Sequence, residues 1–332
     1  MNENTVDPAE LWEQTRGQIR AIREQTARVI VGQDDVVELM LTALLCKGHC
    51  LIVGVPGLAK TLLVSTLGKI LGLKFNRIQF TPDLMPTDIV GSEIIQTAEA
   101  GSRSFEFAAG PIFANLILAD EINRTPPKTQ AALLEAMQEK QVTVAGRTRR
   151  LEEPFLVFAT QNPIEHEGTY PLPEAQLDRF FFELLIDYPT LDEELAILDR
   201  TTGAELAEAD TILDSAGLLR LQATIHDIPL PANLQRTIVN LTHASRPASP
   251  LADEFVKKYV SWGAGPRASQ TLVRATRALA LLRGREAASL EELRAVAPAV
   301  LRHRVIPNYN ATGEGISVEE IIRHLLGNGL SA

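Results

Sequence analysis

The chain has 332 residues, of which 45% are hydrophobic and 22% charged, an ordinary composition for a globular protein of about two domains. Its formal net charge of −10 counts against a general polyanion binder, because nucleic-acid-coating surfaces normally carry a basic excess. The first residues lack the features of a secretory signal, and no apolar run reaches the length of about 18 residues that a membrane helix needs. We therefore expect a cytoplasmic protein without membrane insertion.

The chain opens with helical periodicity over residues 10–48, interrupted at VIVGQDD. A short apolar strand, CLIVG at 50–54, then leads through a Gly-rich turn into a helical pattern that stops at Gly72. The segment CKGHC contains Cys46 and Cys50, which suggests metal ligands, yet a zinc site needs about four and no second Cys/His cluster follows. We expect two buried thiols, one ending a helix and the other beginning a strand.

Strands and helices continue to alternate as far as residue 186. Apolar segments at 75–80, 115–120, 155–160 and 181–186 are typical of strands, and TQAALLEAMQEK is typical of a helix. This alternation predicts an α/β fold with a mostly parallel sheet of five strands covered on both faces. The segments around TAEAGSR and around AGR each predict a projecting β-hairpin.

Beyond DYPTLDEEL the strand pattern disappears, and four or five amphipathic helices are expected. The stretch SLEE at 289–292 predicts a capping box at the start of one of them. The second domain is therefore expected to be all-helical.

The stretch GVPGLAKT at 54–61 is close to a phosphate-binding loop, with Ala59 where the usual pattern has glycine. It lies between a strand and a helix, so backbone N–H groups and the helix N-terminus can converge on phosphate oxygens. Lys60 would reach the β and γ phosphates, and the Thr61 hydroxyl would ligate Mg²⁺. Ala59 fits this loop if its φ is helical, which we expect.

Polar side chains end two further strands. In NLILADE, Asp120 can hold Mg²⁺ through its water shell and Glu121 can orient and activate the attacking water; the alternative is that both acids cap the next helix. In FATQNP, Asn162 can hydrogen-bond the γ phosphate or the water, although an Asn before Pro163 is also typical of a turn. The sequence therefore predicts a nucleotide site at the ends of the strands.

These segments resemble the AAA+ ATPases and, within them, the MoxR family. The similarity covers residues 28–305, and Ala is common in that family at the position of Ala59. The matching segments are VGQ at 31–33, GVPGLAKT, TPDLMPTDIVG, FEFAAGPIFANLILADEINR, PPKTQAALLEAMQE, FATQNPIEHEGTYPLPEAQLDRF and GPRA at 265–268.

The resemblance implies an AAA+ P-loop domain whose strands are ordered 5-1-4-3-2, followed by a C-terminal helical lid. The implied domains are an N-terminal helical lead-in at 1–27, the nucleotide-binding domain at 28–190 and the lid at 191–332. The hairpin at about 88–108 corresponds to the helix-2 insert, and that at about 141–151 to the pre-sensor-1 hairpin.

The resemblance also implies a homo-oligomeric ring, usually a hexamer, with ATP between neighbouring subunits. Arg179 in LDRF matches the arginine finger and Arg267 in GPRA matches sensor 2, while Val31 and Gly32 match the adenine-side contact. Alternatives remain: an ion pair of Arg179 with Asp178 or Glu174, Arg124 as a rival finger, and a plain loop at 31–32. Arg267 follows Pro266 at a helix start, which favours an anion there.

The expected site is therefore as follows. The catalytic residues are Lys60, Glu121, Asn162, Arg179 and Arg267. The metal ligands are Thr61 and Asp120, and the nucleotide-binding residues are Val31, Gly32, Gly54, Val55, Pro56, Gly57, Leu58, Ala59, Lys60, Thr61, Leu62 and Asp120.

The expected function is Mg²⁺-dependent ATP hydrolysis coupled to remodelling, maturation or metal-cofactor insertion of a protein client. The resemblance suggests clients with von Willebrand factor A domains. One alternative is a DNA motor resembling the MCM helicases, but the acidic total counts against it. Another is a nucleotide-gated scaffold with little turnover, although no expected catalytic residue has been lost. The basic hairpin GRTRR either is a solvated hairpin or binds an acidic or extended polypeptide or, in principle, nucleic acid.

Overall fold

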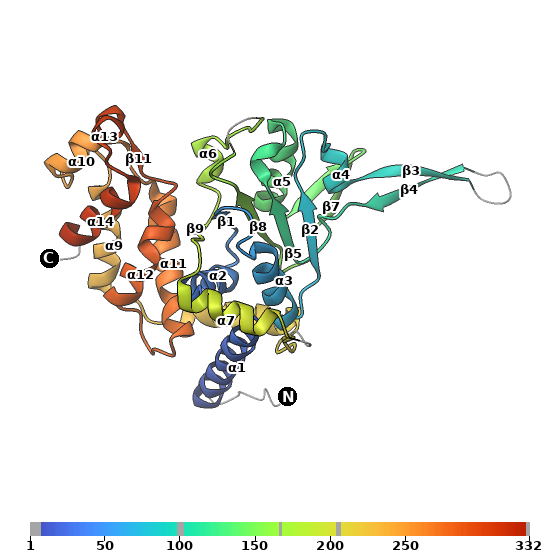
Figure 1. The fold of residues 1–332 in the computed structure, drawn as a ribbon, viewed down its shortest axis with the longest axis horizontal. Helices are drawn as coiled ribbons and strands as arrows, with labels where there is room; N and C mark the ends of the chain where they lie inside the picture. The colour runs from blue at the N-terminus through green and yellow to red at the C-terminus, as the bar shows by residue number, and fades with distance from the viewer. Residues whose placement is uncertain (1–7, 98–102, 166–167, 204–206, 330–332) are drawn as a thin grey trace, which may run out of the picture.

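The computed structural model describes residues 8–97, 103–165, 168–203 and 207–329. A parallel sheet of five strands lies at its centre (Figure 1), ordered β2-β5-β8-β1-β9. Its strands are β1 (Cys50–Val53), β2 (Phe75–Gln79), β5 (Leu116–Asp120), β8 (Leu156–Gln161) and β9 (Phe182–Leu185). Counted along the chain and read from the β9 edge, the order is 5-1-4-3-2, as predicted.

Helices cover both faces of the sheet because alternate strand residues point to opposite sides. Leu116 and Leu118 belong to one buried cluster, and Ile117 and Ala119 belong to the other. The first cluster includes α2 (Asp34–Leu45) and α3 (Lys60–Ile70), and the second includes α5 (Pro127–Glu139). The layered α/β fold expected from the sequence is confirmed.

The helix α1 (Pro8–Val29) leads into α2, so the break at 29–35 separates two helices as predicted. Cys46 follows the last residue of α2 and Cys50 begins β1, and both are free and buried. Burial raises the pKa of Cys46 to about 12, so this thiol stays protonated. The described residues contain no cluster of three or more His, Cys, Asp or Glu side chains suited to a metal.

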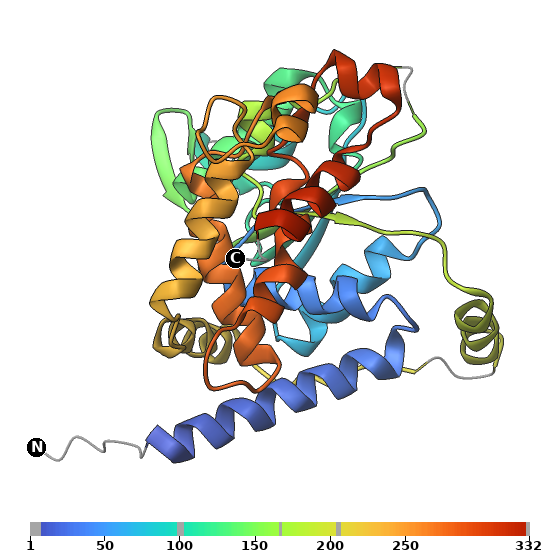
Figure 2. The ribbon, with the colours of Figure 1, turned by 90° about the vertical axis from the view of Figure 1, so that its left-hand side faces the viewer.

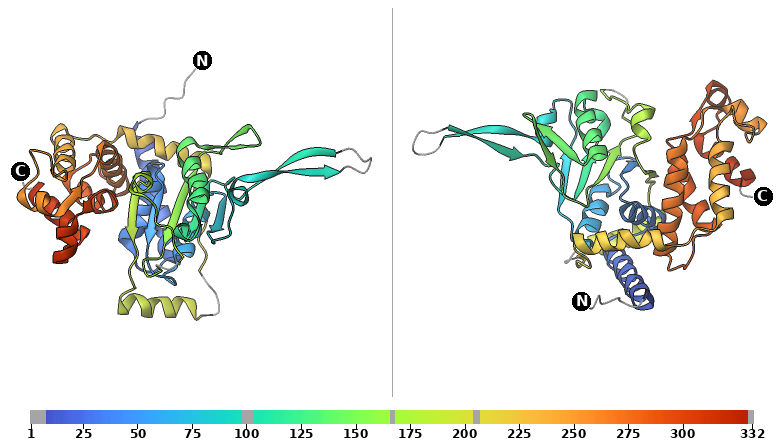
Figure 3. Two further views of the ribbon diagram at one scale, coloured as in Figure 1. Left: turned by 90° about the horizontal axis from the view of Figure 1, so that it is seen from above. Right: turned by 180° about the vertical axis from the view of Figure 1, so that it is seen from behind.

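Two hairpins project from the sheet, as Figure 3 shows. The longer pairs β3 (Gly91–Thr97) with β4 (Arg103–Ala109) after the short α4 (Pro86–Val90); most of its expected turn, at 98–102, lies outside the described residues. The shorter pairs β6 (Gln141–Val144) with β7 (Arg147–Arg150). Arg149 of the second lies 3.7 Å from the ring centroid of Phe107 in the first, so a cation–π contact joins the hairpins.

The C-terminal part is helical, with eight α-helices between residue 191 and residue 329 in the described chain rather than four or five. They are α7 (Leu191–Thr201), α8 (Ser215–Thr224), α9 (Ala232–Ala244), α10 (Glu254–Tyr259), α11 (Pro266–Leu282), α12 (Leu290–Leu301), α13 (Tyr309–Glu314) and α14 (Val318–Gly329). The number was underestimated because helices of six residues, such as α10 and α13, are too short to show periodicity. The predicted capping box is present, with Ser289 at the N-cap of α12 and Glu292 reaching back to it.

The helical part also contains a two-stranded antiparallel ladder of β10 (Val260–Trp262) and β11 (Ile306–Pro307), which the sequence pattern did not predict. Short segments complete the fold: α6 (Glu174–Leu177) and the 3₁₀ turns η1 (Ile122–Arg124) and η2 (Ile225–Asp227). Helix α11 packs on α2, and Figure 2 shows α7 standing away from the sheet. No helix in the described ranges is long and apolar enough to span a bilayer.

Candidate active site

Parallel pairing brings the C-terminal ends of three strands together. Val53 of β1 is in register with Gln161 of β8, and Ala119 of β5 is in register with Ala159 of β8. The residues that follow these strands therefore meet at one edge of the sheet. A pocket of 380 Å³ lies there, lined by Pro56, Gly57, Leu58, Ala59, Lys60, Thr61, Arg77, Asp120, Glu121 and Asn162.

The loop before α3 turns through two residues with positive φ. Gly57 has φ +88°, and Ala59 has φ +53° with ψ 24° as the N-cap of α3. The expectation of a helical φ at Ala59 was wrong, because the helix begins one residue later, at Lys60, and the chain reaches it through a left-handed conformation. A Cβ atom disfavours that conformation by about 1–2 kcal/mol, which explains why the usual pattern has glycine here.

Ala59→Gly is therefore expected to raise the free energy of unfolding by about 0.5 kcal/mol, since relief of the left-handed strain exceeds the added freedom of the unfolded chain. Ala131→Gly is the matched control because Ala131 is exposed within α5. That variant should lose about 1 kcal/mol. Urea unfolding of both variants measures the difference, and a loss of stability in Ala59→Gly similar to that in Ala131→Gly would contradict the strain argument.

The same loop offers a set of unpaired donors. Within the described chain, the backbone N–H groups of Val55, Gly57, Leu58 and Ala59 donate no hydrogen bond. The Lys60 ammonium donates to the carbonyl oxygens of Gly54 and, at 3.2 Å, Val55. Burial lowers the pKa of Lys60, and the charges of Asp120 and Glu121 oppose this shift. Free amides beside an ammonium group suit phosphate oxygens.

Two adjacent carboxylates face this loop across the pocket. Asp120 accepts a hydrogen bond from the Thr160 hydroxyl at 2.6 Å and forms an ion pair with Arg77 at 2.6 Å. Glu121 accepts from the Gln79 amide at 2.8 Å and from Arg124 at 3.1 Å. Neither acid caps α5, whose N-cap is Pro126 without a side-chain cap. A carboxylate and a hydroxyl in one pocket are oxygen ligands of the kind that Mg²⁺ prefers.

Sequence reasoning missed Arg77, Gln79 and Thr160. Arg77 and Gln79 alternate along β2, which pairs with β5 so that Gln79 lies opposite Asp120. The Thr160 hydroxyl also accepts a hydrogen bond from the Glu121 N–H at 2.8 Å, so it contacts both acids. The period-two spacing in FNRIQF contained the signal for the first two, but only the strand order shows that they face the acids.

Asn162 has features of both roles predicted for it, a turn residue and a contact to the γ phosphate or the water. Its side-chain oxygen accepts from the Ile164 N–H at 3.2 Å, which is a turn contact. Its side-chain nitrogen is buried and has no hydrogen-bond partner among the residues that the structure describes. Since buried amides are normally paired, this donor in the wall of the pocket suits an oxygen of a bound ligand.

The two predicted arginines do not line the pocket. Arg179 makes no ion pair with Asp178, Glu174 or any other described residue. Arg267 pairs instead with Asp178 at 3.1 Å. The rival finger, Arg124, pairs with Glu121 of its own chain.

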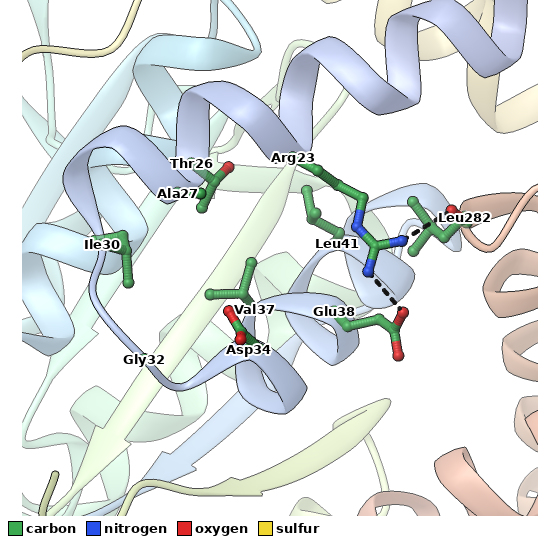
Figure 4. Close-up of a pocket in the computed structure, with 10 residues that line it drawn as sticks. All are labelled: Arg23, Thr26, Ala27, Ile30, Gly32, Asp34, Val37, Glu38, Leu41 and Leu282. Carbon is green, nitrogen blue, oxygen red and sulfur yellow. Dashed lines mark hydrogen bonds and ion pairs between the residues drawn. The ribbon is translucent and has the colours of Figure 1, made fainter. Parts of the chain in front are cut away.

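Val31 and Gly32 also lie outside the phosphate pocket. Gly32 borders a separate pocket of 290 Å³ between α1 and α2 (Figure 4), where Arg23 pairs with Glu38 at 3.2 Å. A Cβ atom at Gly32 would lie 2.0 Å from a carboxylate oxygen of Glu193 in α7. The glycine therefore allows a close approach of α7.

Family models match two parts of the chain. Residues 49–182 match the ATPase family associated with various cellular activities (AAA), and residues 252–325 match an AAA lid domain. The chain is 48% identical to Chaperone MoxR1 of Mycobacterium tuberculosis, over 92% of this chain and 80% of that protein. It is 36% identical to Protein MoxR of Paracoccus denitrificans, over 87% of this chain and 89% of that protein.

A solved structure agrees with the fold. A proposed ATPase from Cytophaga hutchinsonii superposes with a TM-score of 0.89 at 41% identity, covering 96% of each chain. The similarity therefore extends over the sheet and the helical part together.

Proposed function

The chain belongs to the MoxR family of AAA+ ATPases and is an ATP-hydrolysing enzyme with a chaperone-like role; from this premise we propose that Mg²⁺-dependent turnover remodels or matures a protein client, or inserts its metal cofactor. The observation that carries the proposal is the pocket in which the loop at 54–61, Asp120, Glu121 and Asn162 meet. Its unpaired amides, ammonium group and carboxylates suit a nucleoside triphosphate with a divalent cation.

Each residue then has a role that its position supports. The backbone N–H groups of Val55, Gly57, Leu58 and Ala59 and the Lys60 ammonium bind the phosphates. Thr61 and Asp120 would hold Mg²⁺. Bound Mg²⁺ would neutralise charge on the β and γ phosphates. Glu121 orients the attacking water and accepts its proton, and Asn162 donates its free amide N–H to the γ phosphate or the water.

In a hexameric ring, an arginine of one subunit would reach the nucleotide pocket of its neighbour. We assign the nucleotide-binding domain to residues 28–190 and the lid to 191–332, with Val31 and Gly32 on the adenine side. Arg179 of one subunit completes the pocket of its neighbour, which agrees with its lack of an acidic partner in the described chain. Arg267, at the start of α11, serves as sensor 2.

The long hairpin is the part proposed to touch the client. Ile95 of β3 and Phe105 of β4 are 59% and 73% exposed on an arm that projects from the sheet. Apolar side chains exposed on a projecting arm suit transient contact with a polypeptide. Nucleic acid is a poorer occupant of the short hairpin, because Arg149 already stacks on Phe107. Clients with von Willebrand factor A domains are the class to test first.

The proposal is tested by ATP hydrolysis per subunit, measured with Mg²⁺ over a range of protein concentrations. We expect a specific rate that rises with concentration, because the site is shared between subunits, and that disappears when EDTA removes Mg²⁺. A rate independent of concentration would contradict a shared site. Near-zero turnover despite ATP binding, with client present, would favour a nucleotide-gated scaffold.

A further inference from the structure

The segment that carries Arg179 is held by a buried arginine from the helical part. Arg304, which follows α12, is only 5% exposed. Its guanidinium donates to the Asp178 carboxylate at 2.8 Å, to the Phe180 carbonyl at 2.6 Å and to the Phe181 carbonyl at 3.4 Å. It also donates to the Val300 carbonyl at 2.6 Å, which ties it to its own helix. One side chain therefore contacts residues on both sides of Arg179.

This contact depends on the shape of the arginine side chain. A planar guanidinium presents five N–H groups in a fixed fork, so it can bind one carboxylate and several carbonyls at once. Burial lowers the pKa of Arg304, and the Asp178 carboxylate opposes that shift. The imidazole of the preceding residue, His303, lies 3.1 Å from the Phe180 carbonyl through Nε2. The buried charge is thus neutralised by Asp178 and solvated by backbone oxygens.

A second arginine from the helical part reaches the same acid. Arg267, at the start of α11, binds the Asp178 carboxylate at 3.1 Å and its carbonyl oxygen at 3.2 Å. Asp178 therefore links α11, the end of α12 and the segment before β9. Arg179, the next residue, makes no ion pair within the described chain. The backbone on both sides of Arg179 is therefore held by the helical part.

We propose that Arg304 is a positioning residue that couples the helical part of one subunit to the Arg179 side chain offered to the next subunit. The inference rests on the proposed role of Arg179. A shift of α11 and α12 in a subunit would move the carbonyls of residues 178–181 and change the fit of Arg179 in the neighbouring pocket. The nucleotide pocket of the same subunit does not include Arg304.

The test uses Arg304→Lys, which keeps a positive charge opposite Asp178 but cannot bind all the carbonyls together. We expect kcat to fall by about 100-fold with KM unchanged, since a displacement of about 1 Å at a catalytic group has an effect of that size. The affinity for a fluorescent ATP analogue should stay unchanged. The matched control is Arg302→Lys, because Arg302 binds Glu319 and the Glu183 carbonyl and should leave kcat within about twofold.

Subunit mixing separates positioning from damage to the fold. In rings mixed with Lys60→Ala subunits, which keep Arg179 but lack the phosphate-binding ammonium, the intact pocket of Arg304→Lys subunits is completed by a normal Arg179. Activity should therefore return, as it should for Arg179→Ala mixed with Lys60→Ala. If Arg304→Lys does not fold, Asp178→Asn tests the same contact with a side chain of equal shape.

The outcomes are distinct. Recovery in both mixtures supports the inference. Recovery with Arg179→Ala but not with the folded Arg304 or Asp178 variant overturns the inference and leaves the proposed function standing. Recovery in neither mixture overturns the role of Arg179 itself, and unchanged kcat in Arg304→Lys overturns the positioning role directly.

Discussion

Glu121→Gln is expected to lower the rate of ATP hydrolysis by about 10²- to 10⁴-fold while ATP binding is retained. The substitution keeps the size of the side chain and one oxygen for the contacts with Gln79 and Arg124, but an amide cannot accept the proton of the attacking water. Binding is retained because the phosphate loop and Lys60 are unchanged. Phosphate release and the binding of a fluorescent ATP analogue, measured on the same preparation, test both halves of the expectation.

The control for Glu121→Gln is the same change at Glu135, which is exposed on α5 outside the pocket. That variant should hydrolyse ATP at the original rate. Full hydrolysis by Glu121→Gln would show that another group activates the water. Loss of binding together with hydrolysis would instead mean that Glu121 supports the pocket rather than the chemistry.

Arg179→Ala is expected to lower kcat by about 10³- to 10⁵-fold, because a finger arginine neutralises charge that develops only in the transition state of phosphoryl transfer. ATP affinity should change little, since Arg179 does not line the pocket of its own subunit. The measurement is kcat and KM at a protein concentration where the specific rate of the unmodified protein has reached its plateau.

Arg124→Ala is compared with Arg179→Ala because Arg124 is the alternative candidate for the arginine finger. Arg124 contacts Glu121 of its own chain at 3.1 Å, so its loss should act within one subunit and should not be rescued by Lys60→Ala partners. Rescue of Arg124→Ala and not of Arg179→Ala would reverse the assignment. Activity that survives in Arg179→Ala would remove the argument for a shared site.

The sequence alone led to the fold class, the phosphate loop and the strands that end in Asp120 and Asn162. These features are readable because strand, loop and helix follow one another within a few residues, and local pattern reports local structure. The order of the strands came from the family resemblance, and the parallel register confirmed it. The roles of the individual site residues stay predictions until the variants are measured.

The sequence prediction was wrong where the conformation of a residue depends on the surrounding loop, or where an element is too short to show a pattern. Ala59 was expected to be helical because it stands beside a helix pattern, yet the turn of the loop places it in the left-handed region. Helices of one or two turns were missed because six residues cannot establish a period.

Local patterns along the chain identified the chemical groups and the elements that carry them: a phosphate loop, two carboxylates, an amide and the candidate arginines. Which of these groups meet depends on how the strands and helices pack. Arg77 and Gln79 lie beside the two acids because β2 pairs with β5, and Arg304 reaches Asp178 across 126 residues of chain. Hydrogen bonds and ion pairs act over a few ångströms regardless of separation in sequence, so these partners could be identified only from the folded chain.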